Sequence, residues 1–221
     1  AIDRLVGWCS LKRSGRLHHQ SRSERNLMMS PSGPFALAFA VVGLALLSPA
    51  QAADTNRASP DPMASFHGGT VIPAFGKVAS VTDADMRIPA GTEFHIAFDV
   101  AAANESTLNR TLESAARFLN MQVEAGVPAE RIHLAIVVHG SATFDVAGAE
   151  AYERKYPGAE NPNAALVDAL IKAGVRIIVC GQSAAGQGVK KTDLLPGVEL
   201  ALSAMTAHAL LQQQGYTLNP F

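Results

Sequence analysis

The sequence predicts an α/β fold built on a mainly parallel central sheet. Short apolar segments of strand length alternate with longer segments of helical periodicity, and glycine stands at most of the joints between them. Residues 132–138 are apolar at nearly every position, which is typical of a parallel strand that is covered on both faces. Successive strands joined through helices form right-handed crossovers, so the strands are expected to run parallel.

The elements follow in order from residue 91. Residues 105–125 predict a long helix, because apolar side chains recur there at spacings of three and four residues and Gly126 follows. No element is assigned to the polar stretch 141–162. Strands are expected at 94–100, 132–138, 175–179, 198–202 and 216–218. Further helices are expected at 163–173, 182–187 and 204–214. The domain is therefore expected to span 91–221, with a sheet of about five strands.

The chain before residue 91 has a different character. Residues 1–27 carry six Lys/Arg and two acids, which is typical of a disordered basic arm or of sequence upstream of the true translation start. Residues 28–52 contain a short apolar run and end in small residues, so we expect a secretory signal peptide that is cleaved after Ala52. An uncleaved anchor is the alternative, although the run is shorter than the roughly 20 residues of a membrane span. Residues 53–90 are expected to form a linker and an irregular arm.

The composition excludes several classes of protein. The 221 residues carry a formal net charge of −1, which lacks the basic excess of a dedicated nucleic-acid binder. Two cysteines, Cys9 and Cys180, are too few for a disulfide-rich scaffold or a cysteine-based zinc finger. Cleavage after Ala52 would lower the net charge to −5 and leave Cys180 as the only thiol. The mature protein is then expected to be periplasmic or secreted and to have no membrane segment.

Three polar residues, Asp99, His139 and Cys180, stand at the ends of the first three expected strands. Ligands of parallel sheets bind outside the carboxyl ends of the strands. Cys180 is the candidate nucleophile, because backbone N–H groups and the positive end of a following helix stabilise a thiolate. The alternative is that Cys180 is a small, buried apolar side chain.

His139 and Asp99 are the candidate partners of this cysteine. His139 is a candidate base, ligand or orienting group, and the alternative is a ring that bonds a carbonyl at the strand end. Asp99 is a candidate for holding a cation or orienting His139, and the alternative is a turn-forming or helix-capping carboxylate. The candidate ligand-binding residues flank these side chains and are Gly140, Gly181, Gln182 and Ser183.

No cofactor or metal motif is present in the sequence. The chain lacks a G-x-S-x-G elbow, a P-loop and a G-x-G-x-x-G turn, so no cofactor is expected. The other histidines of the domain region lack the spacing of zinc ligands, and no metal is expected. They are His67, His95, His133 and His208. His95 and His133 lie within expected strands and are interpreted as ordinary positions on a strand face.

Several segments of the chain resemble the DsrE/DsrF-like family. They are residues 131–140, 161–174, 175–183, 195–198, 202–206 and 211–216. The joint occurrence of a strand-ending His-Gly, a Cys-Gly and a Pro-Gly-Val carries the resemblance, which covers about residues 93–221. It implies a three-layer α/β sandwich with flavodoxin-like layering, which assembles into homotrimers or hexamers.

The resemblance also implies a chemistry for Cys180. The best understood members are intracellular sulfur carriers whose corresponding cysteine takes up persulfide sulfur and hands it to a partner thiol. The chain departs from their pattern at Gln187, where the sulfur-relay members have an arginine before the glycine, and in its expected leader.

Three hypotheses therefore stand for the function of the chain. The first is that Cys180 carries or transfers sulfane sulfur as a persulfide, with a thiol or persulfide protein or a small sulfur compound as its partner. The second is a non-catalytic module that binds a small ligand or a soft metal ion where Asp99, His139 and Cys180 meet. The third is an oligomeric structural protein in which Cys180 is buried.

Overall fold

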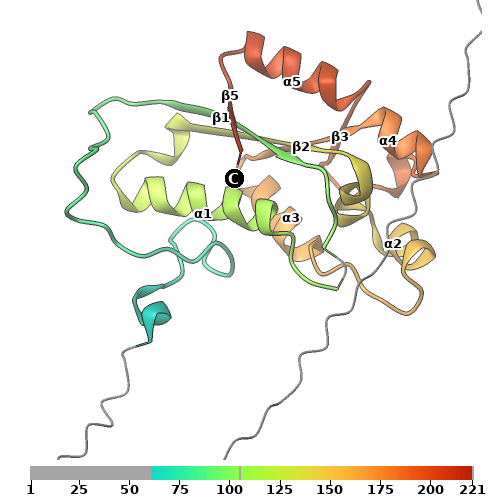
Figure 1. The fold of residues 1–221 in the computed structure, drawn as a ribbon, viewed down its shortest axis with the longest axis horizontal. Helices are drawn as coiled ribbons and strands as arrows, with labels where there is room; N and C mark the ends of the chain where they lie inside the picture. Colours follow the sequence, from blue (N-terminus) through green and yellow to red (C-terminus); the bar gives the residue numbers. More distant parts are fainter. Residues whose placement is uncertain (1–60, 105, 221) are drawn as a thin grey trace, which may run out of the picture. The chain divides into compact units, whose positions relative to one another are not determined.

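The computed structural model describes residues 61–104 and 106–220 (Figure 1). The predicted basic arm at 1–27, the predicted signal peptide at 28–52 and its cleavage after Ala52 lie outside the described residues. Across the described ranges, no helix combines the length and the apolar character that crossing a membrane requires.

Five strands form one sheet in the order β4-β3-β2-β1-β5, and every neighbouring pair is parallel. The strands are β1 (Phe94–Val100), β2 (Ile132–Val138), β3 (Arg176–Cys180), β4 (Glu199–Ala201) and β5 (Thr217–Asn219). β1 and β2 pair over their whole length, from Phe94 opposite Ile132 to Val100 opposite Val138. The predicted α/β class with a parallel sheet of five strands is confirmed.

Helices cover both faces of the sheet. The α-helices are α1 (Arg110–Glu124), α2 (Ala149–Lys155), α3 (Ala164–Lys172), α4 (Gly181–Gly186) and α5 (Ala204–Gln213). The short 3-10 helices are η1 (Pro62–Ser65), η2 (Ala129–Arg131), η3 (Gly140–Val146) and η4 (Lys191–Asp193). Figure 1 shows α5 on one side of the sheet and α1 and α3 on the other. This layering confirms the expected three-layer sandwich.

Side chains alternate along each strand, so each face of the sheet contributes to its own hydrophobic cluster. The two clusters differ in size. The larger cluster joins Phe98, Ile136 and Ile177 to the apolar sides of α1 and α3. The smaller cluster joins small residues such as Ala97 and Ala135 to α5. β2 is buried on both faces, as its apolar sequence predicts.

The helix expected at 105–125 begins later, at Arg110. Asn109 has extended backbone angles, and its side-chain oxygen accepts hydrogen bonds from the backbone N–H groups of Thr111 (3.0 Å) and Leu112 (3.4 Å). This N-cap satisfies donors of the first helical turn, so the helix starts after Asn109. The apolar periodicity alone does not reveal the start, because Leu108 continues the same spacing.

The polar stretch 141–162 contains two elements to which the sequence analysis assigned nothing, η3 and α2. α2 is seven residues long and its Tyr152 is almost fully buried. Asn161 stabilises the preceding turn, because its amide donates hydrogen bonds to three backbone carbonyls, those of Phe144, Asp145 and Ala147. A single buried face over two turns is too short a pattern to be read from sequence.

The arm at 66–90 is irregular, as expected, but it packs on α1. Its one β-bridge joins His67 to Val78. The buried side chain of Asn120 accepts a hydrogen bond from the Ile72 N–H (2.9 Å) and donates to the Ile72, Phe75 and Gly76 carbonyls. One amide thus satisfies backbone groups that would otherwise be buried without partners.

Candidate functional site

The carboxyl edge of the sheet brings the three predicted residues to one face. The residues two positions earlier on β1, β2 and β3 all pack under α5. Because side chains alternate along a strand, Asp99 and Cys180 point to the same side. His139 directly follows β2 with an extended backbone, so it continues the alternation. All three predicted residues therefore lie at one edge, on the face that α5 covers.

Cys180 is both the last residue of β3 and the N-cap of α4. Its Sγ accepts a hydrogen bond from the Ser183 backbone N–H at 3.4 Å. The residue is 6% exposed, so the thiol is shielded from bulk solvent. The strand end and helix start that the sequence predicted for this cysteine are both confirmed.

Hydrogen bonds favour the ionised form of this thiol. Burial raises the pKa of Cys180, but hydrogen bonds from the Ser183 side chain and from the backbone N–H groups of Ser183, Ala204 and Gln182 outweigh it. The pKa therefore lies below the ordinary value of a cysteine. The thiolate is the nucleophilic form of a cysteine, and this shift favours it.

Ser183→Ala is expected to raise the pKa of Cys180, because it removes the side-chain hydrogen bond to the sulfur. The measurement is the pH dependence of iodoacetamide alkylation, followed by intact mass in a Cys9→Ser background where Cys180 is the only thiol. The control is Ser114→Ala, which makes the same substitution on α1, on the other side of the sheet from α5. A Ser183→Ala profile that superimposes on the wild-type profile would contradict this assignment.

Asp99 holds two histidines at the same edge. Its Oδ2 accepts a hydrogen bond from His139 Nε2 (3.1 Å), and its Oδ1 accepts one from His208 Nε2 (2.7 Å). Partial burial raises the pKa of Asp99, but the bonds from the two imidazoles keep it below the usual range. Asp99 does not cap α1, since Asn109 takes that role. The catalytic assignment of Asp99 and His139 stays a prediction.

His139 lies next to Cys180 in the sheet, but the two side chains are not bonded. The pairing of β2 and β3 ends with Val138 opposite Val179. His139 is the next residue after Val138, and Cys180 is the next residue after Val179. Among the residues that the structure describes, no hydrogen bond or ion pair joins Cys180 to His139 or Asp99. The structure therefore brings Asp99 and His139 together and leaves the thiol beside them.

Sequence reasoning missed His208. It lies on α5, 109 positions after Asp99, and its side chain is only 18% exposed. No local motif marks it. The contact forms only because α5 follows β4, at one edge of the sheet, and crosses the sheet toward β5, which pairs with β1. Its position in the first half of the last helix is the only sequence signal that could have suggested it.

The predicted ligand-binding residues make contacts that hold the site together. The Gly140 N–H donates to Ser183 Oγ (3.0 Å), and the Gly140 carbonyl accepts from the Gln187 side chain. The Gln182 side chain donates to the Leu202 carbonyl (3.3 Å). A Cβ on Gly181 would meet the Ala201 carbonyl oxygen at 2.6 Å, so this glycine permits close backbone packing. Their assignment to ligand binding stays a prediction.

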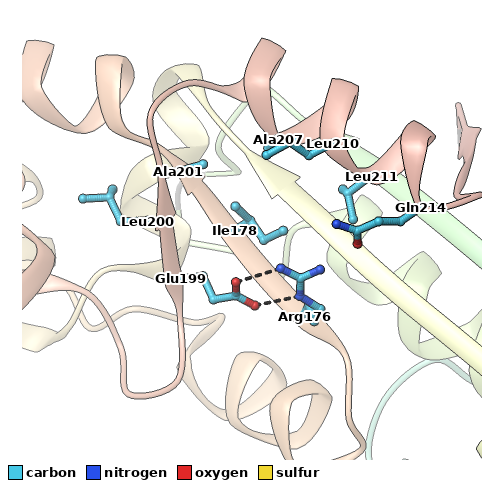
Figure 2. Close-up of a pocket in the computed structure, with 9 residues that line it drawn as sticks. All are labelled: Arg176, Ile178, Glu199, Leu200, Ala201, Ala207, Leu210, Leu211 and Gln214. Carbon is cyan, nitrogen blue, oxygen red and sulfur yellow. Dashed lines mark hydrogen bonds and ion pairs between the residues drawn. The ribbon is translucent and has the colours of Figure 1, made fainter.

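A cavity of about 180 Å³ is lined by residues of α5 and of the strands β3 and β4. Figure 2 shows Arg176 and Glu199 in its lining, joined by two hydrogen bonds of 2.9 Å each. Ile178 and Leu211 form part of its apolar lining. Cys180 does not line this cavity, so the cavity is separate from the thiol.

Comparison with known proteins identifies a family whose model the sequence matches. The DsrE/DsrF-like family matches residues 92–220. A comparison with curated proteins found no match. Among solved structures, the chain is similar to MTH1491, a protein of unknown function from Methanobacterium thermoautotrophicum, with 16% identity and a TM-score of 0.45 over 58% of this chain and 100% of that one. It is also similar to the ychN protein from E. coli, with 15% identity and a TM-score of 0.42 over 58% of this chain and 99% of that one.

Proposed function

Because the chain belongs to the DsrE/DsrF-like family, we propose that it carries or transfers sulfane sulfur as a persulfide on Cys180. One observation carries the proposal, which is the position of the thiol. Cys180 ends β3 and caps α4, where hydrogen bonds lower its pKa despite burial. A thiolate held in this way is a nucleophile toward sulfur.

The proposed reaction needs no oxidant. The Cys180 thiolate attacks the outer sulfur of a donor persulfide, R–S–SH. The bond between the two donor sulfurs breaks, a bond from Cys180 Sγ to the transferred sulfur forms, and the donor leaves as the thiolate R–S⁻. An acceptor thiolate then attacks the same outer sulfur and releases the Cys180 thiolate, so the protein returns to its initial state.

His139, which is hydrogen-bonded to Asp99, supports this chemistry. His139 follows β2 next to Cys180 in the register of the sheet, and Asp99 fixes the orientation of its ring. We propose that His139 receives the proton of the Cys180 thiol or balances the charge of the thiolate. Asp99 acts through the histidine and is a positioning residue.

The test is whether Cys180 accepts sulfur. The full chain in a Cys9→Ser background is reduced, incubated with inorganic polysulfide and measured by intact mass. A small donor suits a thiol that is only 6% exposed. We expect a mass increase by whole sulfur atoms on the protein with Cys180, and its release as thiocyanate by cyanide.

The matched control is the same chain with Cys180→Ser, which preserves size and removes the nucleophile. No adduct is expected on this variant. A folded protein with Cys180 that takes up no sulfur would overturn the proposal, and so would an equal adduct on Cys180→Ser. Either result would favour the hypothesis that Cys180 is a buried structural cysteine.

A further inference from the structure

A second cluster of ionisable side chains lies at the opposite edge of the sheet from Cys180. Glu93 directly precedes β1, and His95 follows it on the same face because side chains alternate along the strand. His133 on β2 is the register partner of His95. The amino ends of two paired strands therefore present one carboxylate and two imidazoles side by side.

The ligand atoms of this cluster have nearly the spacing of a metal site. Glu93 Oε1 lies 2.9 Å from His133 Nε2 and 3.4 Å from His95 Nε2. One ligand atom from each residue lies within 4.8 Å of the other two. In a tetrahedral zinc site with bonds of about 2.0–2.2 Å, neighbouring ligand atoms are about 3.3–3.6 Å apart. Small movements would therefore bring the three groups onto one ion.

The cluster is partly exposed, and only small changes in ring orientation are needed. The rings of His95 and His133 are stacked, with centroids 4.5 Å apart and planes inclined by 29°. The side chains are 35% and 39% exposed, and that of Glu93 is 55% exposed. Rotation about χ2 of histidine is a soft torsion, so both nitrogen lone pairs can turn toward a common point. The exposure also leaves a path for the ion and a coordination position for water.

We propose that Glu93, His95 and His133 bind a divalent transition-metal ion, with Zn²⁺ as the preferred occupant. Two imidazoles and one carboxylate suit Zn²⁺, whereas Mg²⁺ and Ca²⁺ prefer oxygen ligands throughout. Three protein ligands leave a fourth position for solvent, as in open zinc sites. Zn²⁺ would replace the hydrogen bond that now joins Glu93 to His133.

The surroundings of the cluster predict a modest affinity. Ligating histidines usually donate their second ring N–H to an acceptor, and loss of such a partner typically costs 10–100-fold in affinity. His95 Nδ1 is buried without a hydrogen-bond partner in the part of the chain that the structure describes. Tyr216 packs on the His95 ring at 5.3 Å, edge to face, and restrains the ring without that bond.

The experiment is calorimetric titration of the full chain with ZnCl₂. The background is Cys9→Ser, His18→Gln and His19→Gln, which removes other zinc ligands near the amino terminus. One equivalent of Zn²⁺ is expected to bind. His95→Gln and His133→Gln are each expected to weaken binding at least about 10-fold, because the loss of a ligand exceeds the loss of an outer-shell partner. Circular dichroism checks that the variants fold.

Two controls separate this site from others. His67→Gln removes a comparable exposed histidine, whose Nε2 pairs with Glu124 (2.9 Å) and which is not part of the cluster, and should leave binding unchanged. Cys180→Ser should also leave it unchanged, so failure of the sulfur-carrier proposal does not affect this test. Unweakened binding in His133→Gln would overturn the inference. Loss of binding in Cys180→Ser would overturn it too, because it would assign the ion to the cysteine edge.

Discussion

Gly140→Ala is expected to lower the free energy of unfolding by about 3 kcal/mol. Gly140 has φ +55, in the left-handed region that costs other residues roughly 1–2 kcal/mol. A Cβ at this position would also meet the Ala101 carbonyl oxygen at 2.5 Å. Relief of this contact requires movement of the backbone, and overpacking of this kind costs about 1–3 kcal/mol.

The measurement is urea unfolding followed by circular dichroism, with Gly188→Ala as the matched control. Gly188 has φ +69 and nothing within 4 Å of the position of a Cβ. It therefore shares the backbone strain of Gly140 but lacks the contact with Ala101. Equal losses of stability in the two variants would show that the close approach at Gly140 has no energetic role.

The same substitution should also affect the cysteine. Gly140 links β2 to α4, because its N–H donates to Ser183 Oγ and its carbonyl accepts from Gln187. A shift of Gly140 would disturb Ser183, whose hydrogen bonds lower the pKa of Cys180. We expect slower alkylation of Cys180 at neutral pH in Gly140→Ala and unchanged alkylation in Gly188→Ala.

Asp145→Asn is expected to stabilise the protein by up to about 3 kcal/mol at pH 8 and to have little effect near pH 3.5. Asp145 is only 1% exposed, and burial raises its pKa from 3.8 to about 6, although Asn109 and Asn104 donate hydrogen bonds to it. Its Oδ1 has no hydrogen-bond partner among the described residues. The charged form is therefore costly in the folded state.

The direction of the pH dependence follows from proton binding. Between pH 4 and 6 the folded protein holds a proton on Asp145 that the unfolded chain releases, so stability contributed by this group is lost as the pH rises through about 6. Below the unfolded pKa of 3.8 the side chain is neutral in both states. Asparagine is neutral throughout and accepts the Asn109 amide through its carbonyl oxygen.

The check is thermal unfolding of both proteins from pH 3.5 to pH 8. The control is Asp168→Asn, which removes an exposed carboxylate that pairs with Lys172 on α3. That pair should contribute less than about 1 kcal/mol at any pH. A difference between Asp145→Asn and wild type that does not grow between pH 4 and pH 6 would show that Asp145 titrates normally.

Much of the fold could be predicted because strand and helix periodicity are local properties. β2 and the body of α1 follow from the spacing of apolar residues. The start of α1 could not be predicted, because Asn109 acts as a cap only through bonds to Thr111 and Leu112. α2 was missed, since its burial depends on contacts with η3 and not on a long periodic pattern.

The site was predictable in part for the same reason. Strand ends are local features, so the sequence alone placed Asp99, His139 and Cys180 at one edge of a parallel sheet. Only the tertiary structure decided that Asp99 binds His208 as well as His139, because α5 must first return across the sheet. It also decided that His95 lies opposite His133, since register depends on pairing between strands and not on spacing within one. The sequence therefore determined which chemistry each strand carries, and packing determined which side chains meet.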